Sequence, residues 1–158
     1  MRKFANLFEE MTSTERLFEA WNLFRKGKRK RADVLAFERH LEKNIFRLSR
    51  DLKALCYQHS PYGSFFIQDP KVRHIRKASV RDRLVHQAVY SVLTHIFDPR
   101  FIHELYSSRL GKGTHAGVNA LACMTRKVSK NYTRECWALK CDVRKFYDSV
   151  DHKRLTEF

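Results

Sequence analysis

Apolar residues recur at three- and four-residue intervals through the first third of the chain. Thr12, with Glu15 three residues later, has the spacing of a helix-capping box and is followed by four apolar residues at helical intervals: Leu17, Phe18, Trp21 and Phe24. A second helix is predicted from about Asp33 to Leu55, because the same period continues through Val34, Phe37, Leu41, Ile45, Leu48, Leu52 and Leu55. Two amphipathic helices therefore open the chain.

The pattern changes in the middle of the chain. Residues 65–67 form a short apolar run, Asp69 and Pro70 predict a turn, and residues 72–77 alternate as a second strand. A β-hairpin rich in Lys and Arg is the result. Ser79 and Asp82 then predict the capped start of a long helix that ends near Asp98 and Pro99.

The last third begins with a basic loop punctuated by glycine, followed by a helix for which Thr114 is the predicted N-cap. Trp137, Leu139 and Cys141 then alternate with Ala138, Lys140 and Asp142, which is the period of a β-strand. A turn and a helix capped by Ser149 or Asp151 complete the chain. Helices, one hairpin and one further strand in this order predict an α+β fold, mostly helical.

Charge adds a class of partner to this picture. The 158 residues contain 32 Lys and Arg against 17 Asp and Glu, a formal net charge of +15. Such a surplus favours polyanions, since neutralising phosphates releases condensed counterions. No apolar run approaches the roughly 18 residues of a membrane span, and the N-terminus lacks the apolar core of a signal peptide. We therefore expect a cytoplasmic protein that contacts nucleic acid and no membrane.

Two features leave alternatives open. Six of the seven residues from Arg25 to Arg31 are basic, which fits a solvated loop, a phosphate-contacting loop or a nuclear-localisation signal. The four cysteines form no CxxC pair and are expected to be reduced thiols in ordinary packing positions.

Asp142, at the end of the predicted strand, has three readings. It could be a capping or salt-bridged residue, as expected in so basic a chain. A phosphoryl-transfer nucleophile of the Asp-x-Asp type is disfavoured because position 144 is Arg. It could also bind a hard cation such as Mg²⁺, whose phosphate-bearing substrates the basic surroundings would attract. Asp142 alone does not decide among them.

The residues around Asp142 resemble a known family. The stretch "KCDVRKFYDSVDHKRL" is similar to the first catalytic motif of reverse transcriptases, "QDPKVRHIRKASVRDRLVHQAV" resembles their fingers motif, and "YSSRLGKGTHAGVNAL" resembles the motif that follows. The amino-acid sequence of the third stretch is more similar to the reverse transcriptases of diversity-generating retroelements than to those of group II introns. The first helix, with Trp21, and the basic segment after it also resemble the start of that group. Three motifs in the family's order cover most of the chain.

The resemblance implies a fold and a division of the chain. Residues 1–60 would be an N-terminal helical extension, 61–135 the fingers with the hairpin, and 136–158 the start of the palm with one palm strand. The activity implied is RNA-directed DNA polymerisation, in which deoxynucleotides are added to a primer 3′-OH on an RNA template by two Mg²⁺ ions. The partners implied are an RNA template, a DNA or RNA primer, deoxynucleoside triphosphates and a small basic accessory subunit.

The resemblance also implies roles for individual residues. Asp142 would be the catalytic metal ligand, with the carbonyl of Val143 as a further ligand beside the nucleotide, and Tyr147 would be the aromatic under the incoming sugar. Lys71 and Arg73 would clamp the triphosphate. The expected nucleic-acid contacts are Arg81, Arg83, Arg109 and Lys112. The loop that carries Arg109, Lys112 and His115 could touch the template or lie in solvent, and His115 could be only a residue at the start of a helix. For Lys71 and Arg73 the structural alternative is solvated charge on the hairpin.

The second acidic motif of the family, Tyr-x-Asp-Asp, is not found in these residues. No adjacent Asp-Asp pair occurs in the sequence, so the Tyr-x-Asp-Asp motif that completes the metal site would lie beyond Phe158, with the rest of the palm and the thumb. The 158 residues by themselves are expected to be inactive. Two other hypotheses stay open: a non-catalytic nucleic-acid-binding remnant, and a structural or interaction fragment whose charge serves solubility.

Overall fold

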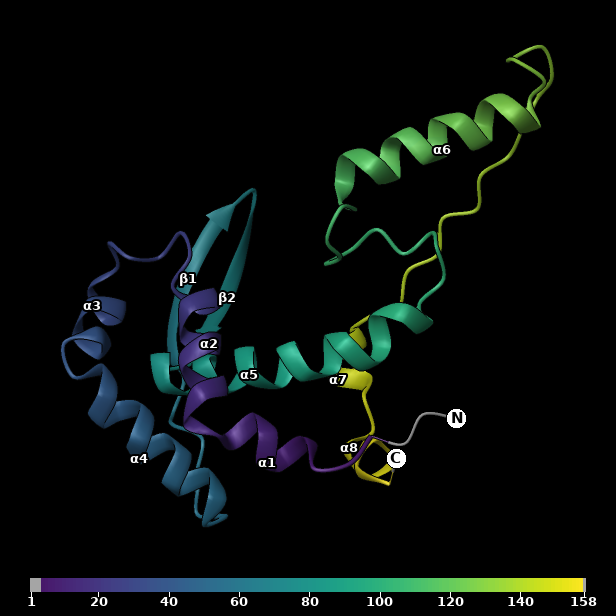
Figure 1. Ribbon diagram of the computed structural model, residues 1–158. Helices are drawn as coiled ribbons and strands as arrows, with labels where there is room; N and C mark the ends of the chain where they lie inside the picture. Colours follow the sequence, from purple (N-terminus) through teal and green to yellow (C-terminus); the bar gives the residue numbers. More distant parts are fainter. Residues whose placement is uncertain (1–3, 158) are drawn as a thin grey trace. The chain divides into compact units, whose positions relative to one another are not determined.

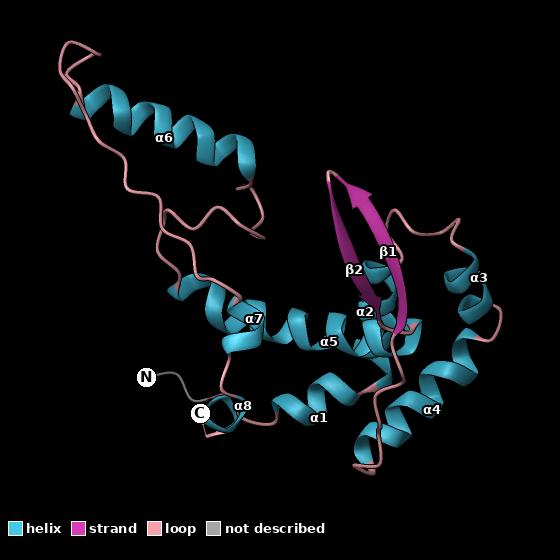
Figure 2. Ribbon diagram, turned by 180° about the vertical axis from the view of Figure 1, so that it is seen from behind, coloured by secondary structure: helices cyan, strands magenta, loops and turns pink. Residues whose placement is uncertain are grey.

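The computed structural model describes residues 4–157, as a mixed α+β structure that divides into two compact units. The first unit ends at Phe101 and the second begins at Ile102. Figures 1 and 2 show helices throughout the chain and a single two-stranded hairpin, and this confirms the α+β class. Each unit is described separately below.

The described part of the chain before the hairpin contains four helices where the sequence pattern predicts two, and the first additional helix precedes the predicted start. Helix α1 spans Leu7–Thr12 and α2 spans Thr14–Phe24. Ser13, rather than Thr12, is the N-cap of α2, since its side chain accepts a hydrogen bond from the backbone N–H of Arg16. The Thr12 hydroxyl instead donates to the carbonyl of Phe8, 2.8 Å away. The predicted capping position was therefore wrong by one residue.

The single helix predicted from Asp33 to Leu55 is two helices. Helix α3 spans Ala32–Glu38 and α4 spans Leu41–Lys53, and Figure 1 shows them running in different directions. His40 leaves helical geometry at φ −127°, ψ 39°. The Asn44 side chain donates to the carbonyl of Phe37 across this break, 3.0 Å away. Apolar spacing stays in register across such a bend, so periodicity alone did not reveal it.

The hydrophobic core of the first unit lies between α2, α4 and α5. Helix α5 spans Val80–Phe97, and the short 3-10 turn η1, Asp98–Arg100, follows it. Fully buried side chains come from all three helices: Leu17, Trp21, Ile45, Leu48 and Leu84. The Trp21 ring stacks on Phe37 with 5.1 Å between ring centroids, which fastens α3 to the same core.

The predicted hairpin and the cap after it are confirmed. Strand β1, Gly63–Asp69, pairs antiparallel with β2, Lys71–Lys77, and Pro70 lies in the turn. The Ser79 hydroxyl accepts a hydrogen bond from the backbone N–H of Asp82 at 3.2 Å, and α5 begins at the next residue, Val80.

The second unit contains three helices among its described residues. Helix α6 spans Thr114–Val128, α7 Phe146–Ser149 and α8 His152–Thr156. Thr114 is the first helical residue rather than the N-cap, which is Gly113 with φ 119°. Asp151 caps α8, as predicted, and accepts from the backbone N–H groups of Lys153 and Arg154. Ser149 is instead the last residue of α7.

The predicted palm strand is not formed. Residues 135–143 have no regular secondary structure, and the side chains of Trp137 and Leu139 are 94% and 91% exposed. A strand needs the backbone of a partner strand for its hydrogen bonds. In residues 4–157, β1 and β2 pair with each other and no other strand is available. The alternating pattern therefore indicates a preference for the extended conformation, which forms a β-strand only when a partner strand is present.

Candidate nucleic-acid interface

The hairpin places two predicted functional cations on one face. Side chains alternate along a strand, so Lys71 and Arg73 share a face, and the register puts Asp69 opposite Lys71 and Ile67 opposite Arg73. Both cations are exposed. Within the described part of the chain, neither forms an ion pair with a carboxylate. Two exposed cations beside the hairpin tip, neither held in an ion pair among the described residues, are suited to binding phosphate.

The opposite face of the hairpin carries aromatic and apolar side chains. Phe66 lies directly opposite His74, and their rings stack with centroids 4.7 Å apart. Phe66 is 71% exposed and Val72, on the same face, is 66% exposed. Exposed rings beside cations are the usual components of surfaces that bind unpaired nucleic acid. This face was missed from sequence, although the turn at Pro70 would have given its register.

The base of the hairpin is tied to helix α3 through one carboxylate. Asp33 accepts from the Lys77 ammonium at 2.7 Å and from the Arg83 guanidinium at 2.6 Å. The hydrogen bond from Lys77, with that from Arg83, lowers the pKa of Asp33 to about 2 against partial burial. This double ion pair fixes the hairpin on the helical body while the hairpin tip stays exposed.

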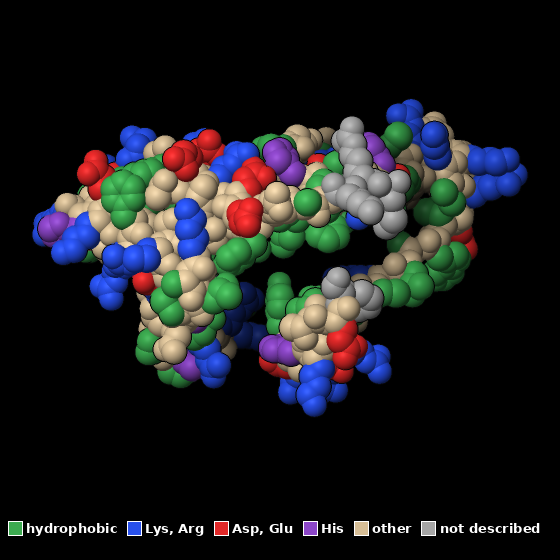
Figure 3. Space-filling view, turned by 60° about the horizontal axis from the view of Figure 1, so that its bottom comes forward, with side chains coloured by type: hydrophobic (Ala, Val, Ile, Leu, Met, Phe, Trp, Pro, Cys, Tyr) green, Lys and Arg blue, Asp and Glu red, His purple; other side chains and the backbone are tan. Residues whose placement is uncertain are grey.

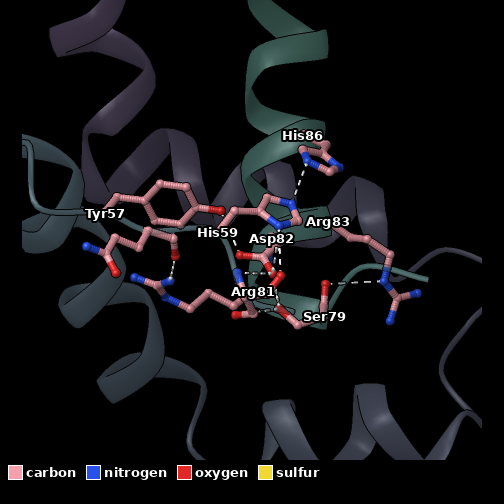
Figure 4. A network of polar contacts seen from close by, with 9 residues as sticks. Tyr57, His59, Ser79, Arg81, Asp82, Arg83 and His86 are labelled. Atoms are coloured by element: carbon pink, nitrogen blue, oxygen red, sulfur yellow. Dashed lines mark hydrogen bonds and ion pairs between the residues drawn. The ribbon is translucent and has the colours of Figure 1, made fainter. Parts of the chain in front are cut away.

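A buried acid organises the start of α5 (Figure 4). The Asp82 side chain is fully buried and accepts hydrogen bonds from the Tyr57 hydroxyl at 2.7 Å, the Ser79 hydroxyl at 2.6 Å and the Ser60 backbone N–H at 3.1 Å. Burial opposes its ionisation, but the bonds from Ser79, Tyr57 and Ser60 outweigh that and lower the pKa of Asp82. Burial, followed by the bond to Asp82, raises the pKa of Tyr57.

Two histidines extend this network toward the surface. His59 Nδ1 lies 3.8 Å from Asp82 Oδ2, and His59 Nε2 lies 3.3 Å from His86 Nε2 (Figure 4). One of the two imidazoles must donate and the other accept for that contact to be a hydrogen bond. The network joins the segment between α4 and β1 to helix α5. We interpret it as the support of the hairpin, because both strands emerge beside it.

Arg81 and Arg83, predicted nucleic-acid contacts, are both engaged inside the first unit. Arg81 donates to Asp51 Oδ2 at 2.9 Å and to the carbonyl of Gln58 at 3.1 Å. Asp51 and Arg81 also line an open pocket of about 390 Å³. Arg83 pairs with Asp33, as described above. Both guanidiniums are positioned by the fold, and a role in nucleic-acid contact stays a prediction.

Arg109 and Lys112 lie in the loop before α6. Arg109 donates to the carbonyl of Ile102 at 3.0 Å. The Lys112 ammonium donates to the carbonyl of His103 and lies 5.1 Å from the centroid of the Tyr106 ring. Intraloop contacts therefore hold both cations, and His115 follows in the first turn of α6. Their predicted contact with nucleic acid is untested.

Asp142, Val143 and Tyr147 are exposed residues of the second unit. Asp142 and Val143 follow one another in the irregular segment before α7, and Tyr147 lies in α7, 86% exposed, edge-on to Phe146. Among residues 4–157, no three His, Cys, Asp or Glu side chains gather in a metal-binding cluster. The Asp142 carboxylate and the Val143 carbonyl are nevertheless hard oxygen donors of the kind that Mg²⁺ takes.

Comparisons with known proteins leave the family open. No protein-family model matches the sequence, and no curated protein matches it. Of the helices in residues 4–157, none combines the length and apolar character required to cross a bilayer.

Proposed function

We propose that the chain is the N-terminal part of a reverse transcriptase, an RNA-directed DNA polymerase, comprising the fingers and the first catalytic motif. The proposal rests on the resemblance of three motifs and on one structural observation. Lys71 and Arg73 project from the same face of an exposed hairpin, without a carboxylate partner in the described residues. Cations that have no structural partner are free to meet a triphosphate.

In this proposal the hairpin binds and orients the incoming nucleotide. The Lys71 ammonium and the Arg73 guanidinium neutralise the triphosphate, and Arg73 adds bidentate geometry. Tyr147 would lie against the sugar and exclude a ribose 2′-OH by contact. Asp142 and the Val143 carbonyl would hold Mg²⁺. When bound, two Mg²⁺ ions would activate the primer 3′-OH and stabilise the pyrophosphate leaving group.

A second candidate is a nucleic-acid-binding protein without polymerase activity. The observation that favours it is the other face of the same hairpin, where the exposed Phe66–His74 pair could stack on bases without any metal. The two candidates share template binding and differ in the need for Asp142.

The decisive experiment uses the complete gene product that contains these residues. Primer extension on an RNA template with Mg²⁺ and deoxynucleotides should fall by several orders of magnitude in Asp142→Asn, with RNA affinity nearly unchanged, because the metal stabilises the transition state. Asp148→Asn is the matched control, since Asp148 is an exposed acid of the same segment. It should retain most activity.

Near wild-type extension by Asp142→Asn would refute the polymerase proposal for this motif. No extension by the wild-type protein, combined with retained RNA binding, would favour the binding protein. Tyr147→Ala gives an independent check, since it should admit ribonucleotides with little loss of deoxynucleotide binding.

A further inference from the structure

The loop Arg25–Arg31 between α2 and α3 is an ordered basic segment. Two turns shape it, in which the N–H of Lys28 donates to the carbonyl of Arg25 and the N–H of Arg31 to that of Lys28, each at 3.0 Å. Gly27 has φ +70°, in the left-handed region that favours glycine. The loop thus has a defined conformation that holds its charges in place.

Two of its cations anchor the loop to the helical body. The Arg25 guanidinium pairs with Glu38 at 2.6 Å, joining the loop to the far end of α3. The Lys28 ammonium donates to the carbonyl of Phe24 at 2.9 Å and lies 4.4 Å from the centroid of the Phe24 ring. Both side chains are partly buried and serve the fold.

The other four cations face solvent. Lys26, Arg29, Lys30 and Arg31 are exposed. In the portion of the chain that the structure describes, no carboxylate forms an ion pair with any of them. Their charge is therefore uncompensated, unlike that of Arg25.

Further positive charge lies beside the loop. Arg83 lies 5.3 Å from the Phe24 ring, which Lys28 also contacts. Partial burial, then the charges of Arg83 and Arg31, lower the pKa of Lys28. The neighbouring acid, Asp33, is already shared by Lys77 and Arg83. Like charges kept so close repel one another, and a bound polyanion would relieve that repulsion.

We propose that the loop Arg25–Arg31 is a separate nucleic-acid contact surface, which binds the phosphate backbone of a duplex. The exposed loop side chains are ammonium and guanidinium groups, which commonly bind phosphate oxygens, and none carries an aromatic ring on which an unpaired base could stack. A duplex presents phosphates with its bases hidden. The exposed Phe66–His74 pair of the hairpin instead fits unpaired bases. This proposal does not depend on polymerase activity.

The test compares two variants with equal change in net charge. In the loop variant, Lys26, Arg29, Lys30 and Arg31 are replaced by Gln. In the control variant, four exposed cations of α4 are replaced by Gln: Lys43, Arg47, Arg50 and Lys53. The probes are a fluorescent RNA duplex of about 20 base pairs and a single strand of equal length, in about 50 to 200 mM salt.

The loop variant should bind the duplex at least about tenfold more weakly, with the slope of log affinity against log salt shallower by about three. The control variant should change the slope by less than about one, because its charges touch no phosphate. The single strand should be less affected than the duplex. Equal losses in both variants, or an unchanged loop variant, would overturn the proposal.

A measurement on the wild-type protein covers the case in which the loop variant folds poorly. Mild lysine acetylation with and without the duplex should show protection of Lys26 and Lys30, while Lys43 and Lys53 on α4 react equally in both conditions. Reaction of Lys26 and Lys30 that the duplex leaves unchanged would likewise refute the proposal. Neither readout involves nucleotide addition, so the outcome is independent of the polymerase test.

Discussion

At the scale of single residues, Asp82 has the most consequential environment. Its carboxylate is fully buried and receives donors from Tyr57, Ser60 and Ser79, of which the first two precede it by more than twenty residues. A carboxylate is acceptor-only, so it can receive all three donors at once. The residue that caps α5 therefore also closes the fold around the base of the hairpin.

Asp82→Asn should lower the free energy of unfolding by about 2–3 kcal/mol. The NH₂ group of asparagine would replace a carboxylate oxygen and would face the hydrogen-bond donors of the site instead of accepting from them. Tyr57→Phe, which removes a single bond, should cost about 1 kcal/mol. Denaturant unfolding followed by circular dichroism measures both. A cost for Asp82→Asn no larger than for Tyr57→Phe would contradict the role of Asp82 as the shared acceptor.

The same acid gives a pH dependence with a defined sign. The pKa of Asp82 in the folded state is below its ordinary value of 3.8, so its stabilisation is present above that value and is lost as the pH falls through the lowered pKa. Asp33, with a folded pKa of about 2, acts in the same direction. The stability difference between the wild type and Asp82→Asn should therefore shrink below about pH 4. A constant difference down to pH 2 would be inconsistent with this account.

At the scale of elements, strand alternation places Lys71 and Arg73 on the opposite face of the hairpin from the stacked ring pair, although Phe65 and Ile67 share the face of the two cations. The stacked pair consists of Phe66 and His74. Its base is fixed by the ion pairs of Asp33 and its tip is exposed. Each face can therefore be altered without the other.

Replacing Lys71 and Arg73 by Gln should flatten the salt dependence of RNA binding by about two units, with the fold unchanged because both side chains lack structural partners among residues 4–157. Fluorescence anisotropy across a salt series measures this slope. If the RNA affinity of the wild type did not change with salt concentration, the hypothesis that the positive charge serves only solubility would be favoured.

Phe66→Ala should weaken the binding of single-stranded RNA by about 1–3 kcal/mol, through the loss of a stacked base, and should leave duplex binding nearly unchanged. Val72→Ala is the matched control, since Val72 is exposed on the same face but has no ring. Equal effects of the two changes would indicate general apolar contact rather than stacking.

At the scale of the whole molecule, the core is unevenly distributed. All buried hydrophobic residues of the described chain lie in the first unit, between Leu17 and Ala88. Helix α6, by contrast, has no buried residue and exposes Val118, Leu121 and Val128. Figure 3 shows hydrophobic side chains lying open among Lys and Arg side chains on the face it draws. Stability should therefore differ between the two units.

Amide hydrogen exchange should show this difference directly. The amides of α4 should be protected to near the global free energy of unfolding, whereas those of α6, a helix of similar length, should exchange much faster. Mass spectrometry of peptides from each helix makes the comparison within one sample. Equal protection of α4 and α6 would show that α6 is covered in solution.

Features that depend on a few neighbouring residues could be predicted from the amino-acid sequence. The turn at Asp69 and Pro70 and the Ser79 cap of α5 follow from side chains within four positions of one another. The same holds for the Asp151 cap of α8. The exposed cations of the hairpin were predicted along with it, because alternation and turn position define both faces of a strand pair.

Contacts between groups far apart in the sequence became visible with the three-dimensional structure. The Ser49 hydroxyl donates to the carbonyl of Thr12, 2.6 Å away, and Asp82 collects donors from the segment before the hairpin. The structure also shows which cations are occupied, since Arg83 pairs with Asp33 while Arg73 stays unpaired within the described residues. Trp137 and its neighbours carry the alternation of a strand but form none. Such pairings depend on the three-dimensional arrangement. A hydrogen-bond donor, a carboxylate or the edge of a strand can pair with any suitable group that the fold brings within reach, and the sequence does not say which group that is.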